Sequence, residues 1–258
     1  MTRNAITLNI LAAIFVVAYF VVAYIHRNRM SGENRCREIV TEISDNSPYL
    51  FITDSVVKLA CGEAVGKQID ELDIYDIERN LRNQFYVDSA EVFTNLEGEL
   101  VVKIWQNEPL VRVISEEGYD FYLDSTLKIL PPQKHLRADL PVVSGKMKFD
   151  FEKKFFGKID HNSQKNSSEF LGKIINFVRL IDSDEFLRNF IVQVYVDSNG
   201  EVELIPRVGE QVILFGKLNE CREKLEKLKI FYQKSMASGW WQSAKTVNVR
   251  YKQQVIVW

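Results

Sequence analysis

The segment that decides the fold reads Ala90-Glu91-Val92-Phe93, then a loop from Thr94 to Glu99, then Leu100-Val101-Val102-Lys103-Ile104-Trp105. The two runs on either side of the loop have the composition of strands. Gly98, inside the loop, is suited to the positive φ that tight turns require. The segment therefore predicts a β-hairpin.

One strand and two helices are predicted before this hairpin. Residues 39–43, Ile-Val-Thr-Glu-Ile, have the β-branched content of a strand, and residues 53–59 suit a short helix. The second helix is clearer, because its apolar residues recur at steps of three and four and so share one face: Ile74, Ile77, Leu81 and Phe85. The order strand, helix, helix, strand, strand predicts two helices packed on one face of a small three-stranded sheet.

Beyond Pro109 the pattern changes, and strands are predicted at residues 110–114, 119–123, 127–130, 191–196, 202–205 and 211–215. Helical stripes are predicted at residues 170–181 and 218–232. Residues 145–168 are expected to form a long surface excursion pinned by aromatic side chains. The lysines of the last helix are expected only to solvate its outer face: Lys217, Lys224, Lys227 and Lys234. The fold class is therefore α+β.

The carboxyl-terminal segment, residues 247–258, is the candidate binding site. Its apolar residues nearly alternate, and its closing residue is Trp258. An apolar strand at a sheet margin is a hazard unless a partner pairs with it, and a partner strand would satisfy its open backbone groups. The segment fits equally well as two strands of the chain's own sheet around Lys252-Gln253, and the two interpretations are compatible.

An apolar run without charges occupies residues 10–25 and can be extended back to Ala5. Roughly twenty-one helical residues reach about 30 Å, the thickness of a bilayer's hydrocarbon core. A cleaved secretory signal has a shorter apolar stretch followed by small residues, so an uncleaved transmembrane helix is favoured. Arginines after the span outnumber Arg3 before it, and this charge count alone would leave the large domain in the cytoplasm.

Composition and motifs give no support for catalysis, a metal, a cofactor or nucleic-acid binding. The 33 basic and 35 acidic side chains leave a net charge of −2, which favours protein partners over polyanions. His26, His135 and His161 have no Cys or carboxylate at ligand spacing, and no nucleophile elbow, phosphate loop or zinc-protease helix occurs. Three widely spaced cysteines argue against a disulfide framework; a Cys36–Cys61 bridge and three buried thiols both remain open.

Four short motifs follow one another along the chain: Trp105-Gln106-Asn107-Glu108-Pro109-Leu110-Val111, Tyr119-Asp120-Phe121-Tyr122-Leu123-Asp124, Leu140-Pro141-Val142-Val143-Ser144-Gly145, and Val247-Asn248-Val249-Arg250-Tyr251 with Gln254-Val255-Ile256-Val257. Together with the single span and the strand-helix-helix-strand-strand module, their order and spacing resemble the bacterial division protein family FtsQ, called DivIB in Gram-positive cells. The resemblance covers essentially the whole chain.

The resemblance implies a short cytoplasmic tail at residues 1–4, a single N-terminal transmembrane helix at 5–25 and a juxtamembrane linker at 26–34. It implies a POTRA-like βααββ domain at 35–114 and, at 115–258, the family's β domain, a mixed β-sheet domain with helices. It places the protein in the cell inner (cytoplasmic) membrane with its C-terminal domain in the periplasm. This topology contradicts the charge count, and we favour it because long domains translocate largely regardless of a few charges.

The resemblance also implies a non-enzymatic scaffold that binds FtsB and FtsL and helps regulate septal peptidoglycan synthesis. In that family FtsB adds a strand to the last β-strand, and an Arg-Tyr segment contributes contacts. The POTRA-like domain is implied to bind other division proteins. The implied partner-binding residues are Val249, Arg250, Tyr251, Val255, Ile256, Val257 and Trp258.

Two functions from other classes compete with this one. A POTRA-domain component of protein transport or envelope assembly would carry tandem POTRA units or a barrel of strands of about ten residues, and the sequence has neither pattern. A membrane-anchored hydrolase would need a pocket containing acidic groups with perturbed pKa values.

Overall fold

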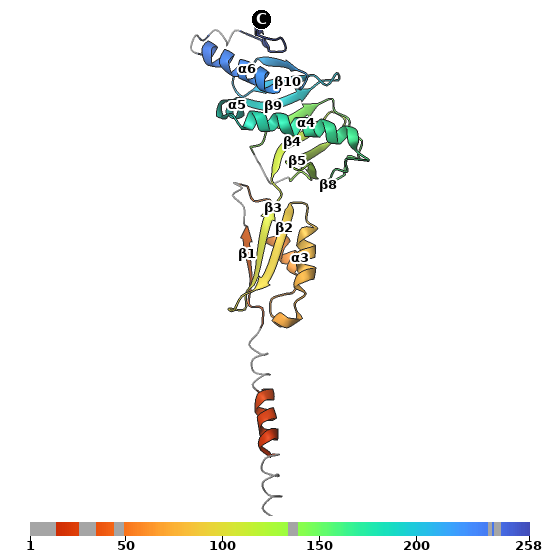
Figure 1. Ribbon diagram of the computed structural model, residues 1–258, viewed down its shortest axis with the longest axis vertical. Helices are drawn as coiled ribbons and strands as arrows, with labels where there is room; N and C mark the ends of the chain where they lie inside the picture. The colour runs from red at the N-terminus through yellow and green to blue at the C-terminus, as the bar shows by residue number, and fades with distance from the viewer. Residues whose placement is uncertain (1–13, 26–34, 44–48, 134–138, 237–238, 240–243) are drawn as a thin grey trace, which may run out of the picture. The chain divides into compact units, whose positions relative to one another are not determined.

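A computed structural model describes residues 14–25, 35–43, 49–133, 139–236, 239 and 244–258 (Figure 1). The chain divides into two compact units, the first comprising Met1–Asn46 with Leu50–Gln106 and the second comprising Ser47–Tyr49 with Asn107–Trp258. Each unit has its own β-sheet and its own helices. The predicted α+β class is confirmed.

Residues 14–25, in the amino-terminal part of the chain, are helical and their side chains are exposed. Within the part of the chain that the structure describes, no helix combines the length and the apolarity needed to cross a bilayer. Residues 5–13 of the expected span, the tail at 1–4 and the linker at 26–34 lie outside the described residues.

The first unit consists of β1 (Ile39–Ile43), α2 (Asp54–Cys61), the 3-10 helix η1 (Ile69–Glu71), α3 (Ile74–Arg82), β2 (Val87–Thr94) and β3 (Leu100–Gln106). β3 lies in the middle of the sheet, parallel to β1 and antiparallel to β2. Ile77 and Leu81 are buried as the helical spacing predicts. Phe85 is not: it follows the end of α3 at Asn83 and is 44% exposed.

The cysteines are free thiols in the structure. Cys36 and Cys61 are buried in the first unit, whereas Cys221 in the second unit is only partly buried. Burial raises the pKa of Cys61 to about 11. Of the two sequence-based alternatives, the structure therefore contains thiols and not a Cys36–Cys61 bridge.

The second unit consists of β4 (Pro109–Ser115), β5 (Asp120–Asp124), β6 (Lys128–Leu130), β7 (Val142–Gly145), β8 (Gly157–Lys158), α4 (Lys165–Asp182), α5 (Glu185–Phe190), β9 (Ile191–Val196), β10 (Val202–Pro206), β11 (Val212–Gly216), α6 (Cys221–Met236), β12 (Thr246–Asn248) and β13 (Ile256–Val257). The ten strands form one mixed sheet in the order β13-β12-β11-β10-β9-β7-β4-β5-β6-β8. The pairs β4/β7, β7/β9 and β11/β12 are parallel. β8 and β13 are therefore the two margins of this sheet.

The division between the units differs from the boundary expected after Ile114. β4 pairs with β5 and β7, so residues 109–114 belong to the second sheet. The sequence analysis also missed four short elements: η1, β7, β8 and α5. β7 ends at Gly145, whose φ is +121° and where a Cβ would overlap the backbone carbonyl of Val196 on β9. Only glycine fits where the backbones of these two neighbouring strands approach so closely.

The core of the second unit lies between the sheet and helices α4 and α6, which cover the same face (Figure 1). Both helices bury the predicted stripes, including Leu171, Ile174, Phe177, Val178 and Ile181 of α4 and Leu225, Leu228 and Tyr232 of α6. The expected surface excursion at 145–168 is partly internal. Met147, Phe151 and Ile159 are buried, because the segment folds its apolar residues onto this core.

Candidate partner-binding site

β13 forms a margin of the second sheet, at the dark blue end of the chain in Figure 1. It is antiparallel to β12, with Val257 opposite Val247, and no described strand lies on its other side. Thr246 and Trp258 exchange both backbone hydrogen bonds, at 3.0 and 3.3 Å. Hydrogen-bonded and non-hydrogen-bonded pairs alternate along antiparallel strands, so the N–H and C=O of Val257 point away from β12, toward the open margin.

The interpretation of residues 247–258 as two strands of the chain's own sheet is confirmed. The segment forms two strands of the chain's own sheet, and the second of them is the marginal strand. The connection between them, residues 249–255, is called the C-terminal loop below. Lys252-Gln253 lies within it, and Gln253 has a φ of +61°.

The implied site residues differ in how far they reach the surface. Tyr251 is 49% exposed, Ile256 38% and Trp258 59%, whereas Val255 and Val257 are half-buried. Ile256 and Trp258 alternate with Val257 and share the opposite side of the strand. The margin thus combines unpaired backbone groups with exposed apolar side chains, which is what strand addition uses.

Val249 does not belong to the exposed set. Its side chain is fully buried in the core, and its N–H donates to the carbonyl of Leu214 on β11 at 3.0 Å. It lies two residues after Val247 and so points to the same, helix-covered side. The structure therefore gives Val249 a core position and no surface that a partner side chain could contact.

Two lysines of α6 donate to backbone carbonyls instead of only solvating the helix. Lys227 Nζ donates to the carbonyl of Val249 at 2.9 Å and also to that of Tyr251. Lys224 is only 6% exposed, and its Nζ donates to the carbonyl of Lys217 at 2.9 Å and to Asn219 Oδ1 at 2.8 Å. Burial lowers the pKa of both lysines. The expectation from helical periodicity was wrong for these two residues.

Arg250 is held within the molecule. Its Nη1 lies 3.1 Å from Oε2 of Glu201, the residue before β10, and its N–H donates to Asn248 Oδ1 at 3.0 Å. Its side chain passes over Gly216, where a Cβ would lie 2.8 Å from Arg250 Cγ. The two residues of the Arg-Tyr segment therefore differ: Arg250 fastens the loop to the sheet, and Tyr251 is exposed to solvent.

An ion pair holds the far side of the C-terminal loop. Lys252 Nζ lies 2.8 Å from Glu220 Oε1, in the turn that precedes α6. The hydrogen bond lowers the pKa of Glu220 and raises the pKa of Lys252. A shallow cavity of about 280 Å³ separates the loop from α6, with lining residues that include Glu223, Lys227 and Tyr251.

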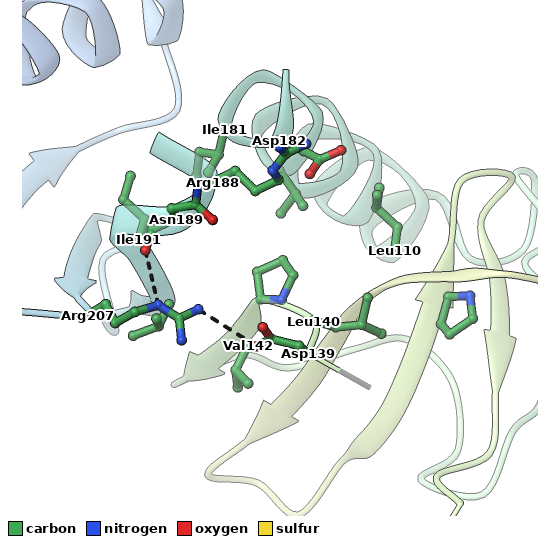
Figure 2. Close-up of a pocket in the computed structure, with 14 residues that line it drawn as sticks. Leu110, Asp139, Leu140, Val142, Ile181, Asp182, Arg188, Asn189, Ile191 and Arg207 are labelled. Carbon is green, nitrogen blue, oxygen red and sulfur yellow. Dashed lines mark hydrogen bonds and ion pairs between the residues drawn. The ribbon is translucent and has the colours of Figure 1, made fainter. Parts of the chain in front are cut away.

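A separate cavity of about 570 Å³ lies in the second unit, where β4, β7 and β9 begin beside α5 (Figure 2). Arg207 donates from Nε to the carbonyl of Asn189 at 3.0 Å, and its Nη2 lies 3.7 Å from Asp139 Oδ1. The described residues that line the cavity include no Ser, Cys, Thr, Tyr, Lys or His. Within the described ranges, no three potential metal ligands come together. The described lining of this cavity therefore offers no hydroxyl, thiol, amine or imidazole group.

Comparison with curated proteins gives no match. The family described as FtsQ/DivIB, C-terminal related, matches residues 108–257, more than half of the chain. The match begins one residue before β4 and ends with β13, so it spans the complete ten-stranded sheet. The FtsQ/DivIB proteins are non-enzymatic division scaffolds, which indicates a role in cell division and contacts with other division proteins. The chain belongs to the FtsQ/DivIB C-terminal related family.

Proposed function

We propose that this chain is a non-enzymatic, single-pass membrane scaffold of the bacterial division machinery. Residues 5–25 anchor it in the inner membrane, and both units lie in the periplasm. It binds partners of the FtsB and FtsL kind and through them helps regulate septal peptidoglycan synthesis. The observation that carries the proposal is the open margin at β13, where the outward backbone groups of Val257 lie beside exposed Ile256 and Trp258.

The partner contributes an extended segment that pairs with β13. Backbone hydrogen bonds to the N–H and C=O of Val257 provide the pairing, and alternate side chains select the partner. Tyr251, Ile256 and Trp258 supply exposed aromatic and aliphatic surface, the kind of surface that dominates binding energy in interfaces. No charged catalytic group is required for this function.

The first unit supports the scaffold role in a second way. We propose that this unit is a POTRA-like domain, which its order β1, α2, α3, β2, β3 supports, and that residues 35–106 bind other division proteins. The two units then have separate tasks: the first contacts other division proteins, and the second recruits the FtsB-like partner.

The sharpest test of strand addition is Val257→Pro. The bonds to β12 come from Trp258 and not from the Val257 N–H, so proline removes only the outward donor. We expect the affinity for the periplasmic segment of FtsB from the same bacterium to fall about ten-fold or more, because a buried donor is lost and the added strand meets the ring. Titration with the detergent-solubilised full chain measures this.

Lys158→Pro at the opposite margin is the matched control. Lys158 also directs its N–H outward, because the N–H of the next residue, Ile159, donates to the carbonyl of Leu127, the residue before β6. This variant should bind the FtsB segment as the unchanged chain does. Equal affinities for Val257→Pro and the unchanged chain, with both folded, would contradict strand addition at β13.

The orientation is tested by a phosphatase that is active only outside the cytoplasm, fused after Trp258. We expect an active reporter, because long domains translocate largely regardless of flanking arginines. A silent reporter, with the same fusion expressed at the same level, would contradict the periplasmic placement and support the charge count.

A further inference from the structure

The marginal strand at the proposed site is too short to hold itself in place. β13 has two residues and pairs only with the three-residue β12, and two-stranded pairings of this size are marginal in water. Its position therefore depends on what holds the C-terminal loop, residues 249–255, which leads into it.

Lys227 of α6 makes the contact that fixes the start of this loop. Its ammonium group donates to the carbonyls of Val249 and Tyr251, which are two residues apart on the loop. The side chain of Arg250, the residue between them, extends in the other direction and forms an ion pair with Glu201. Lysine has three donors on one nitrogen, so one side chain can hold two carbonyls at once.

Lys227 acts in a less solvated setting than an ordinary surface lysine. Burial lowers its pKa, while Glu220 and Glu223 act in the opposite direction. Hydrogen bonds from a charged donor are stronger than those between neutral groups, the more so away from bulk water. The neighbouring Lys224 holds the other loop, at residues 217–219. Two lysines on one face of α6 thus hold two different backbone segments.

We infer that Lys227 is a positioning residue for partner recruitment: it clamps the C-terminal loop to α6 and thereby presents β13 as a preformed margin. This inference rests on the proposed function. Lys227 does not itself contact the added strand in this scheme. It reduces the ordering that the partner would otherwise have to impose, which is the general way in which preorganisation raises affinity.

The experiment compares Lys227→Met, Lys227→Arg and Lys234→Met in the solubilised full chain. Methionine keeps the apolar stem and removes the donors, arginine keeps donors for both carbonyls, and Lys234 is an exposed lysine of the same helix. Two quantities are measured: hydrogen exchange of peptides covering residues 244–258 in the free protein, and affinity for the periplasmic FtsB segment.

We expect Lys227→Met to speed exchange in residues 244–258 and to lower affinity about ten-fold, since one charge-assisted pair of bonds is lost. Exchange of peptides in β4 and β5 should stay unchanged, which separates a local effect from general unfolding. Lys227→Arg should recover most of the affinity, and Lys234→Met should behave as the unchanged chain does.

The inference is overturned if Lys227→Met keeps full affinity while Val257→Pro loses it; the proposed function then stands without the clamp. It is also overturned if Lys227→Met speeds exchange equally in β4 and β5, or if arginine restores nothing. If Val257→Pro and Lys227→Met both bind normally, the proposed function fails and the inference fails with it.

Discussion

The two margins of the ten-stranded sheet have similar backbones and different side chains. Each is a two-residue strand, β8 (Gly157–Lys158) at one end and β13 (Ile256–Val257) at the other. The β8 margin exposes Lys158, whereas the β13 margin exposes Ile256 and the neighbouring Trp258. Charged residues on short edge strands discourage pairing with other chains, and apolar ones permit it.

The backbone does not distinguish the margins. Lys158 and Val257 occupy the same kind of register position, and each directs its N–H away from the neighbouring strand. An open ladder of backbone groups is therefore common to both margins. In the proposed function, the side chains beside the ladder and the contacts that hold it decide which margin accepts a partner.

The largest expected effect comes from displacing the loop that leads into β13. Gly216 has a φ of +77° and lies under Arg250, whereas Gly200 has a φ of +73° and open space around it. We expect Gly200→Ala to lower the free energy of unfolding by about 1 kcal/mol through backbone strain, and Gly216→Ala by about 2–3 kcal/mol because Arg250 must also move. Only Gly216→Ala should also weaken partner binding.

Denaturant unfolding and titration with the FtsB segment measure the two effects. The glycine pair is matched in φ, so the difference between the two variants isolates the contact with Arg250. If both variants lost the same free energy of unfolding and the same partner affinity, the packing of Arg250 over Gly216 would not hold the loop.

The next largest effect is expected when the exposed apolar side chains of the β13 margin are replaced with lysine, the residue that the β8 margin exposes. In the double variant Ile256→Lys, Trp258→Lys both changed side chains are exposed, so stability should change by less than about 0.5 kcal/mol. Partner affinity should fall by about 2 kcal/mol or more, because central apolar contacts dominate interfaces. The reverse change, Lys158→Ile, should not create binding of the FtsB segment. Undiminished affinity of the double variant would contradict a recruitment role for these side chains.

A pH effect on stability is expected where α5 meets α6. Asp184 accepts a hydrogen bond from Lys229 at 2.5 Å and caps α5 through Leu187 N–H at 3.1 Å. The bond from Lys229 lowers the pKa of Asp184 below its ordinary 3.8. The contribution of Asp184 to the free energy of unfolding is therefore complete well above pH 4 and is lost as pH falls through the folded-state pKa.

We expect Asp184→Asn to lower the free energy of unfolding by about 1–2 kcal/mol at pH 6, with the difference from the unchanged chain shrinking below about pH 4. Asp160, beside the β8 margin, is the control. A hydrogen bond from Ser163 also lowers its pKa, but it is fully exposed, and Asp160→Asn should have the smaller effect. A difference for Asp184→Asn that stays constant down to pH 2.5 would contradict the assignment.

The smallest effect concerns the pair Arg250–Glu201, whose side chains are both about one-third exposed. An ion pair of this exposure contributes about 0–1 kcal/mol to the stability of the fold. Arg250→Glu should weaken partner binding modestly by loosening the loop, and the double variant Arg250→Glu, Glu201→Arg should restore it. Failure of the exchange to restore binding, with the fold intact, would indicate that Arg250 contacts the partner directly.

Periodicity predicted the elements that repeat over several turns or strands. The stripes of α3, α4 and α6 and the hairpin of β9 and β10 around Asn199-Gly200 were all identified. β7 and α5 were missed, because four to six residues are too few to establish a period. The division between the units differs from the expected boundary because β4 pairs with β7, which is remote in sequence, and local patterns carry no information about such pairing.

The marginal strand at the carboxyl end could be predicted in position but not in detail. Alternation located β13 and its exposed Trp258, and the same alternation places Val249 beside Val247 in the core, a consequence that the sequence analysis did not draw. The roles of Lys224 and Lys227 could not be inferred. Helical spacing puts both on the outer face, and only the tertiary packing of the loops at 217–219 and 249–251 turns them into donors to backbone carbonyls.

In the proposed function, a partner pairs with the backbone of β13. The most direct measurement is residue-resolved amide exchange of the chain, free and saturated with the periplasmic FtsB segment. We expect the Val257 amide, which faces the open margin in the free chain, to become protected in the complex while the Lys158 amide stays unchanged. A saturated complex in which Val257 exchanges as fast as in the free chain would contradict this pairing.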